Sequence, residues 1–298
     1  IYTSKIKHNY LCKMNKNIKV SVVGCVKDCE KNLEYNYFKI KNTLKNVELN
    51  WFLVESDSND QTIPILKKIA AQDSNFEYIS LGKLFNKYKN RIKRLTHCRE
   101  RYLTEIKNNN NKYNFYIMIM DLDEKMDLFT FKGFKSCFNR KYKWSACSAT
   151  QKKYYYDLYA LRHNNILPND CIDNLKNLDK KNFNYIQNIY QSIYSKMIEI
   201  GNINYWLEVD SAFGGTTIYK KKDLINLSYF SNNNKNFKHS EHVSINFHLK
   251  NLKKKIFINP KFKNFSSTHH DNNWELRYIK FWYYKLLIKS FIKRINLF

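Results

Sequence analysis

Short apolar segments alternate with longer amphipathic ones over the first 120 residues, and this alternation constrains the fold more than any other feature. Apolar runs that predict strands lie at 18–25, 49–55, 76–80 and 114–120. Segments that predict helices lie between them, at 28–44, 62–71 and 91–107. Apolar strands that alternate with helices at this spacing are typical of a parallel sheet with helices on both faces. We therefore predict a Rossmann-like α/β fold with a mostly parallel sheet and right-handed crossovers.

The second half of the chain is less regular. Strands are predicted at 144–150, 202–209, 213–219 and 255–258, and a short helix at 240–250. Residues 151–185, rich in Tyr, Asn and Lys, are interpreted as an insertion. Because no linker rich in Pro, Gly or Ser interrupts the chain, we expect a single compact domain with two lobes. We divide it into an N-terminal extension (1–17), a first half (18–125), a second half (126–270) and a C-terminal basic aromatic helix (271–298).

Composition narrows the class of protein. Hydrophobic residues make up 43% of the chain and aromatic residues 16%, which excludes a disordered protein. The net charge of +26 favours an anionic partner, such as nucleic acid, a phosphate-bearing substrate or a membrane surface. The lysines are spread along the whole chain, so drift toward AT-rich codons is the alternative explanation. The 7 cysteines show no paired C-x-x-C spacing, and we expect reduced thiols in a cytoplasmic protein.

Two acidic side chains, Asp121 and Asp123, directly follow the apolar strand at 114–120. Ligands bind beyond the carboxyl ends of the strands in such sheets, so the pair lies where a site is expected. Residues at i and i+2 can point the same way, and their oxygens suit Mg²⁺ or Mn²⁺, which in turn binds a diphosphate. A solvated loop with a helix cap is the alternative, because a D-x-D motif is weak without its context.

Polar side chains at two further places predict contacts to a nucleotide. Glu55 and Asp57 close the strand at 49–55 and can bind the ribose hydroxyls or the base, or else form a turn that caps the next helix. The helix at 91–107 carries Arg94 and Arg99 among its basic residues. A guanidinium suits phosphate because it bonds in a fork, whereas a solvated basic face is the alternative.

A glycine pair and a helix start add candidates in the second half. Gly214 and Gly215 allow close approach of a ligand or of a second backbone, or form a hairpin. Asp210 lies just before this pair and faces whatever it admits. Glu241 begins the predicted helix at 240–250 and can act as a general base. An acid that merely stabilises the first turn of the helix is the alternative.

The C-terminal region carries two more features. His269 and His270 follow the last predicted strand and are candidate ligands for a metal or a phosphate, with an exposed histidine pair as the alternative. The segment 274–298 places aromatic and aliphatic side chains on one helical face, flanked by three lysines. Such a helix suits a membrane interface, and a helix docked on the domain is the equal alternative.

The order of these motifs resembles nucleotide-sugar glycosyltransferases of the GT-A fold, in particular the fungal capsule-associated mannosyltransferase type and its bacterial and viral relatives. The residues that match the acidic turn, the arginine helix, the acidic strand end and the later S-E motif of that family are Glu55, Ser56, Asp57, Ser58, Asp60, Thr62, Arg99, Leu103, Asp121, Asp123, Ser240 and Glu241. Glu100 stands where the family usually has Asn. The likeness covers about residues 18–270.

The resemblance implies transfer of a sugar from a GDP- or UDP-sugar to a glycan or lipid-linked glycan, with Mn²⁺ or Mg²⁺ as cofactor. It implies that Asp121 and Asp123 hold the cation and the donor diphosphate, and that Glu55 and Asp57 lie near the nucleoside. It also places the Gly214 segment and Glu241 near the donor sugar and the acceptor. The half 18–125 would then bind the nucleotide-sugar and the half 126–270 the acceptor.

Stereochemistry stays open at this point. Glu241 is the candidate base if the enzyme inverts the anomeric centre, and Asp210 or Glu241 would position the sugar if it retains the centre. We expect a cytoplasmic protein, either free or peripheral on the inner face of a membrane.

Two other classes of protein are alternatives. A sugar-phosphate nucleotidyltransferase shares the α/β core, but it needs a glycine-rich phosphate loop after the first strand, and segment 24–28 has a single glycine. A basic nucleic-acid-binding protein fits the charge and the aromatic content. Its aromatic residues would form an exposed platform, whereas here they fall in predicted strands, so we expect no nucleic-acid partner.

Overall fold

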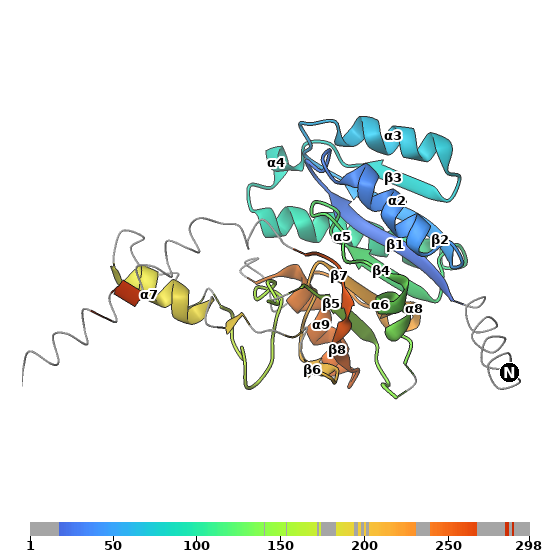
Figure 1. Cartoon of the computed structure of the whole chain (residues 1–298). Coiled ribbons are helices and arrows are strands. Elements are labelled where there is room, and N and C mark those ends of the chain that lie inside the picture. Colours follow the sequence, from blue (N-terminus) through green and yellow to red (C-terminus); the bar gives the residue numbers. More distant parts are fainter. Residues whose placement is uncertain are drawn as a thin grey trace, which may run out of the picture.

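The computed structural model describes residues 18–139, 141–152, 154–171, 173, 183–193, 196–197, 200, 203–230, 239–266, 284–285 and 288. In this part of the chain, eight strands form one sheet in the order β3-β2-β1-β4-β7-β5-β8-β6 (Figure 1). The predicted α/β single domain is therefore confirmed. The extension 1–17, His269, His270 and most of the C-terminal segment 271–298 lie outside the described residues.

The first half of the chain forms the parallel part of the sheet. Its strands are β1 (Lys19–Val26), β2 (Glu48–Glu55), β3 (Phe76–Ser80) and β4 (Tyr116–Met120). β1 lies between β2 and β4 and runs parallel to both, and β3 runs parallel to β2. Val23 of β1 is in register with Phe52 and with Ile119, so the carboxyl ends of these three strands meet at one edge. Most residues of β1 and β4 are buried, which explains their apolar sequences.

Helices cover both faces of this parallel part (Figure 1). They are α2 (Leu33–Thr43), α3 (Thr62–Gln72), the short α4 (Leu84–Lys87) and α5 (Arg91–Asn108). On one face, Ile40 of α2 and Leu66 of α3 belong to the same buried cluster as Leu53 of β2. On the other face, Leu103 of α5 is buried in one cluster with Val54, the next residue of β2. The side chains of successive strand residues therefore point into two separate core layers, one on each face of the sheet.

The second half of the chain forms the mixed part of the sheet. Its strands are β5 (Ala146–Thr150), β6 (Leu207–Val209), β7 (Thr216–Lys220) and β8 (Ile256–Lys263). β7 lies between β4 and β5 and is antiparallel to both, whereas β5 and β8 are parallel. The prediction of a mostly parallel sheet therefore describes the first half better than the second. The predicted strand at 202–209 forms only at its end, because β6 is an edge strand with three residues paired to β8.

Four further helices accompany this second part. They are α6 (Phe131–Ser136), α7 (Phe183–Ser192), α8 (Lys221–Leu224) and α9 (Glu241–Asn251). Of these four helices, the sequence predicted only α9. α6 and α8 are too short to show a helical period. Thr130 caps α6 by accepting a hydrogen bond from the backbone N–H of Gly133 at 3.1 Å. None of the helices in the described ranges is long and apolar enough to cross a bilayer.

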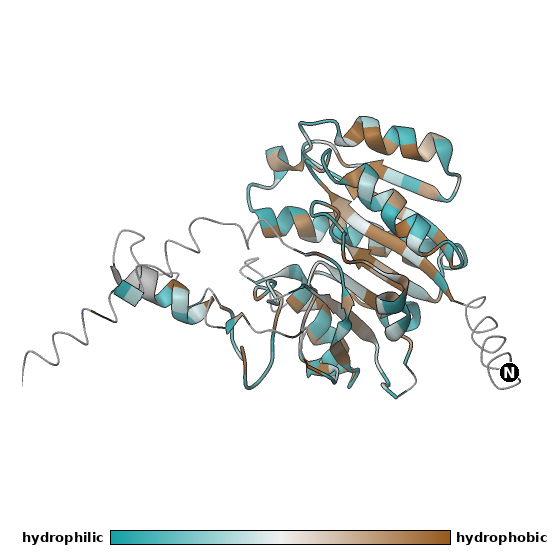
Figure 2. Ribbon diagram, in the orientation of Figure 1, coloured by the Kyte–Doolittle hydropathy of each residue, from teal (hydrophilic) through white to brown (hydrophobic). Residues whose placement is uncertain are grey.

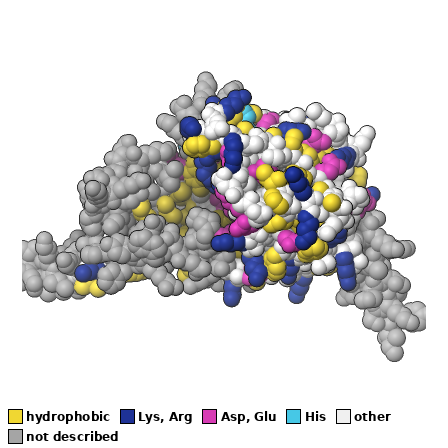
Figure 3. All heavy atoms as spheres, turned by 90° about the horizontal axis from the view of Figure 1, so that it is seen from above, with side chains coloured by type: hydrophobic (Ala, Val, Ile, Leu, Met, Phe, Trp, Pro, Cys, Tyr) yellow, Lys and Arg dark blue, Asp and Glu magenta, His cyan; other side chains and the backbone are white. Residues whose placement is uncertain are grey.

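Charged side chains are spread over the surface, as they are along the sequence. Apolar residues follow the central strands, and polar ones lie in the loops and on the outer helices (Figure 2). On the face seen in Figure 3, the described Lys and Arg side chains are scattered, with Asp and Glu among them, and form no single basic stripe. The six cysteines in the described part of the chain are free thiols, as predicted.

Candidate active site

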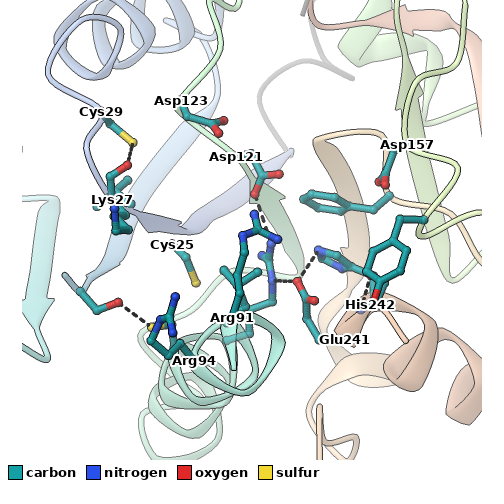
Figure 4. A pocket seen from close by; sticks show the side chains of 18 of the residues that line it. Cys25, Lys27, Cys29, Arg91, Arg94, Asp121, Asp123, Asp157, Glu241 and His242 are labelled. Carbon is teal, nitrogen blue, oxygen red and sulfur yellow. Dashed lines mark hydrogen bonds and ion pairs between the residues drawn. The ribbon is translucent and has the colours of Figure 1, made fainter. Parts of the chain in front are cut away.

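A cavity of about 660 Å³ opens where the carboxyl ends of β1, β2 and β4 meet (Figure 4). This is the volume of a small-molecule binding site. Its walls come from the turns after these strands, from α5, from the loop after β5 and from the start of α9. Its charged or histidine side chains are Lys27, Asp57, Arg91, Arg94, Arg99, Asp121, Asp123, Glu124, Asp157, Glu241 and His242. The sequence-predicted Asp57, Arg94, Arg99, Asp121, Asp123 and Glu241 are all in this set.

Asp121 and Asp123 both line the cavity from the turn after β4 (Figure 4). Between them, Leu122 turns into the core, where it is 1% exposed. The backbone N–H of Asp121 donates to the carbonyl of Gly215 at 2.9 Å, which fixes the turn against the segment before β7. The alternation predicted from the D-L-D sequence is therefore what the structure has.

Arg99 connects the acidic pair to α9. Its Nη2 donates to Asp121 Oδ1 at 3.2 Å, and its Nε donates to Glu241 Oε1 at 2.8 Å. The Arg99 side chain is only 3% exposed, and its guanidinium lies over the ring of Phe213 at 5.2 Å. Its third nitrogen, Nη1, is buried without a hydrogen-bond partner among the described residues. A fixed guanidinium beside a cavity is suited to an anion.

Burial makes the Asp121 carboxyl unusual. Desolvation raises its pKa from 3.8 to about 7, and the neighbouring Asp123 charge acts in the same direction. The Arg99 guanidinium works against this rise by favouring the ionised form. The cavity therefore holds two carboxylates whose mutual repulsion a cation would relieve.

The acidic pair fits a divalent cation that is shared with a ligand. Among the described residues, no group of three or more His, Cys, Asp or Glu side chains gathers as a complete metal cage. Mg²⁺ and similar ions instead bind through one or two carboxylates together with phosphates and waters. Asp121 and Asp123 supply such a partial set, and Arg99 lines the same cavity. His269 and His270, the other predicted metal ligands, lie outside the described residues.

Glu241 is placed differently from what its predicted role requires. Ser240 caps α9 by accepting from the backbone N–H of His242 at 3.3 Å, which sets Glu241 in the first turn. The Glu241 side chain is 4% exposed and is occupied by its bond to Arg99. A carboxylate buried behind a guanidinium positions that guanidinium, and it has little access to a substrate hydroxyl.

His242 lies beside this ion pair. Its ring stacks on Phe213, with the centroids 3.6 Å apart. Both ring nitrogens are buried without a hydrogen-bond partner among the described residues, although Nε2 is 3.8 Å from Glu241 Oε1. Burial, followed by the Arg99 charge, holds the pKa of His242 well below its ordinary value, so the imidazole is neutral.

Glu55 and Asp57 have different surroundings. Glu55 is a structural residue, and Asp57 lines the cavity. Glu55 is buried, and its carboxylate accepts from the backbone N–H of Ser58 at 2.9 Å and from the hydroxyl of Ser80. It is absent from the cavity lining, so the predicted contact to a nucleoside is not supported by its position. Asp57 does line the cavity and has a positive φ of 64°.

Asp57 and Arg94 lie side by side at one end of the cavity. Asp57 Oδ2 is 3.5 Å from Arg94 Nε, and Oδ1 accepts from the backbone N–H of Phe85 at 2.8 Å. Arg94 Nη1 donates to the carbonyls of Tyr88 and Lys89, both at 2.8 Å. These bonds fix the segment before α5, and they leave the second terminal nitrogen of Arg94 for a ligand.

The glycine pair serves close packing of the chain. Gly214 and Gly215 have φ of 64° and 73°, and a Cβ on Gly214 would lie 2.5 Å from the carbonyl oxygen of Ala149. A Cβ on Gly215 would meet the ring of Phe265 at 2.6 Å. Gly214 therefore allows the close approach of a second backbone, which is one of the alternatives predicted from the sequence. Neither glycine is in the cavity lining.

The positions of Asp210 and Gly24 decide two other interpretations of the sequence. Asp210 pairs with Lys250 Nζ at 2.5 Å and is not in the cavity lining, so it is not brought to the site. Gly24 lies inside β1, where a Cβ would meet the carbonyl oxygen of Met120 at 2.4 Å. It serves strand packing rather than a phosphate loop, which leaves the nucleotidyltransferase alternative without support.

Sequence reasoning missed Asp157, which lines the cavity from the loop after β5. Its Oδ2 accepts from the backbone N–H of Gly214 at 3.0 Å and its Oδ1 from that of Ala160 at 3.3 Å. Desolvation raises its pKa from 3.8 to about 6. The available signal was an acid seven residues past the end of a predicted strand, inside a segment interpreted as an insertion.

No protein-family model matches the chain, and no curated protein matches it. Among solved structures, the mannosyltransferase PcManGT from Pyrobaculum calidifontis in complex with GDP-Man and Mn²⁺ is 8% identical, with a TM-score of 0.45 over 89% of this chain and 64% of that one. S. aureus TarS 1–349 is 13% identical, with a TM-score of 0.45 over 89% of this chain and 65% of that one.

The M. tuberculosis glucosyl-3-phosphoglycerate synthase is 10% identical, with a TM-score of 0.46 over 89% of this chain and 78% of that one. This chain spans less than two thirds of the length of PcManGT and of TarS 1–349. All three TM-scores are below 0.5, so these likenesses do not define the function of this chain.

Proposed function

We propose that the protein is a metal-dependent glycosyltransferase of the GT-A type, which moves a sugar from a GDP- or UDP-sugar to a glycan or lipid-linked glycan. The observation that carries this proposal is the Asp121–Asp123 pair, which faces a cavity at the carboxyl ends of three parallel strands beside the buried guanidinium of Arg99. Two carboxylates next to a fixed guanidinium suit a cation bound to a diphosphate.

Each charged group then has a separate task. A bound Mn²⁺ or Mg²⁺ would offset the negative charge on the leaving diphosphate. Arg99, held by Asp121 and Glu241, keeps its positive charge beside the same anion without having to move. Arg94 and Asp57 lie at the β2 end of the cavity, where they can contact the nucleoside.

The direct test of this proposal is binding of the nucleotide. We expect calorimetry to show binding of UDP or GDP that requires Mn²⁺ and disappears with a chelator. Asp123→Asn keeps the shape of the side chain and removes its charge, so we expect nucleotide affinity to fall at least about tenfold, a loss of about 1.4 kcal/mol. The matched control is Glu48→Gln, the same chemical change on a side chain that is 58% exposed at the opposite end of β2.

The outcomes separate clearly. Unchanged affinity in Asp123→Asn, or binding that persists in the chelator, would contradict the metal site. Loss of binding in Glu48→Gln as well would indicate a general effect of lost charge. If the wild type passes this test, hydrolysis of a panel of nucleotide-sugars identifies the donor. A cytoplasmic location, with a lipid-linked acceptor at the inner face of a membrane, is part of the proposal.

A further inference from the structure

Six carboxylates line the cavity, and they differ in what already occupies them. They are Asp57, Asp121, Asp123, Glu124, Asp157 and Glu241. Asp121, Asp123 and Glu124 come from the turn after β4, where the proposed cation would bind. Glu241 is buried against Arg99, and Asp57 holds the backbone N–H of Phe85. Asp157 alone comes from the second half of the chain without an ion pair to any described residue.

The carboxylate of Asp157 is held in place by backbone groups. Its two oxygens accept from the N–H groups of Gly214 and Ala160, at 3.0 and 3.3 Å. The residue is half-buried and comes from the wall that faces Asp121 and Asp123 (Figure 4). Each carboxylate oxygen has a second lone pair, so these bonds orient the group and leave it able to accept a proton.

We infer that Asp157 is the general base that takes the proton from the acceptor hydroxyl, an inference that rests on the proposed function. The hydroxyl oxygen forms the new bond to the anomeric carbon of the donor sugar as its proton passes to a carboxylate oxygen of Asp157. The bond from the anomeric carbon to the diphosphate breaks, and its electron pair leaves with the diphosphate. One such displacement inverts the anomeric centre.

The electrostatics of the cavity agree with this role. Desolvation raises the pKa of Asp157 to about 6, and the Glu241 charge acts in the same direction. The hydrogen bonds from Gly214 and Ala160 and the Arg99 charge oppose the rise. The group is therefore ionised above about pH 6 and yet basic enough to receive a proton. The charge of Asp157 in turn raises the pKa values of Asp121, Tyr155, Tyr156 and Cys171.

A purely structural Asp157 would give different kinetics. In that case it would serve to hold Gly214, and its loss would disturb donor binding and turnover together. A base acts only during the chemical step, so its loss lowers kcat and leaves donor affinity unchanged. It would also remove the group whose ionisation controls the acidic side of the pH profile.

The test is Asp157→Asn in the full chain, with kcat and donor affinity measured on the donor that the panel identifies. We expect kcat to fall by about 10²- to 10⁴-fold, with less than about a threefold change in donor Kd. At saturating Mn²⁺ and donor, which keep Asp121 ionised, the rise in wild-type kcat near pH 6 should be absent in the variant. The matched control is Asp127→Asn, because Asp127 is also half-buried, accepts from a backbone N–H, that of Ser266 at 2.8 Å, and lies outside the cavity lining.

Several results would overturn the inference. Equal losses in kcat and donor affinity, or a pH profile unchanged in Asp157→Asn, would make the residue structural. If that variant does not fold, the wild-type profile decides, because no rise between pH 5 and 7 would exclude Asp157 as the base. A wild type that binds no UDP or GDP would refute the proposed function itself, whereas an active wild type with an equally active Asp157→Asn refutes only this inference.

Discussion

Replacing Asp121 by Asn should make the protein more stable while it removes metal-dependent nucleotide binding. The reason is that the Asp121 carboxylate carries an electrostatic cost in the absence of a cation. Burial raises its pKa from 3.8 to about 7 even though Arg99 favours the ionised form. An amide of the same shape cannot ionise, so it avoids this cost.

The size of the effect follows from the shift in pKa. A rise of about 3 units corresponds to about 4 kcal/mol at 1.36 kcal/mol per unit. Solvent screening of a side chain that is 30% exposed reduces this figure, and we expect about 2 kcal/mol. Because the folded state holds the proton more tightly, the stability linked to this proton is fully present below pH 3.8 and is lost as the pH rises through about 7.

Urea denaturation in the presence of a chelator, at pH 5 and pH 8, measures this difference directly. We expect Asp121→Asn to exceed the wild type by about 2 kcal/mol at pH 8, and by less than half of that at pH 5, because only about 1 of the 3 units lies below pH 5. Adding Mn²⁺ should stabilise the wild type and leave the variant unchanged. A variant that is no more stable at pH 8, or equally stabilised at both pH values, would refute the reasoning.

Asp223→Asn is the control of opposite sign. Burial raises the pKa of Asp223, but bonds from Ser145 and Lys254 outweigh it and hold the pKa below its ordinary value. The same substitution there should lower stability at pH 8.

Two further predictions concern stability. Glu241→Gln should lower the free energy of unfolding by about 3 kcal/mol, because it leaves the charge of Arg99 without its buried partner; denaturation at pH 7 measures this, and a change below about 0.5 kcal/mol would contradict it. Gly214→Ala should cost about 2 kcal/mol or more, because it combines a positive φ with a Cβ placed 2.5 Å from the Ala149 carbonyl oxygen. Gly82 also has a φ of 64°, but no atom lies within 4 Å of a Cβ added there, so Gly82→Ala is the control. If it lowers the melting point as much as Gly214→Ala does, the contact with the Ala149 carbonyl is not the cause of the loss.

The sequence predicted the first half of the fold well because its signals are local. β1, β4 and the second part of β2 are buried, and their apolar runs are separated by helices long enough to show a period. The second half gave weaker signals. β6 pairs over three residues and α8 has four, so neither is long enough to produce a pattern. The position of β7 between β4 and β5 depends on pairing between distant segments, which no local pattern encodes.

The candidate site was predictable where it follows strand ends. Asp121 and Asp123 come directly after an apolar strand, and the structure brings both to the cavity. Glu55 also ends a strand, but its carboxylate turns inward to hold Ser58 and Ser80, a choice that depends on the fold around it. Asp157 was missed because its importance comes from its neighbours Gly214 and Glu241, which are far away in the sequence.

The position of β7 also sets the order in which a nascent chain can complete this site. β4 pairs on one side with β1 and on the other with β7, whose residue Lys220 is in register with Tyr116, about 100 residues earlier. At a synthesis rate of about 5–20 residues per second, the apolar β4 waits roughly 5–20 s for this partner. During that time it is the open edge of a nearly complete parallel half-sheet, and such edges recruit other chains. Slower translation after residue 120 lengthens the time for which this edge is open, and should therefore favour aggregation.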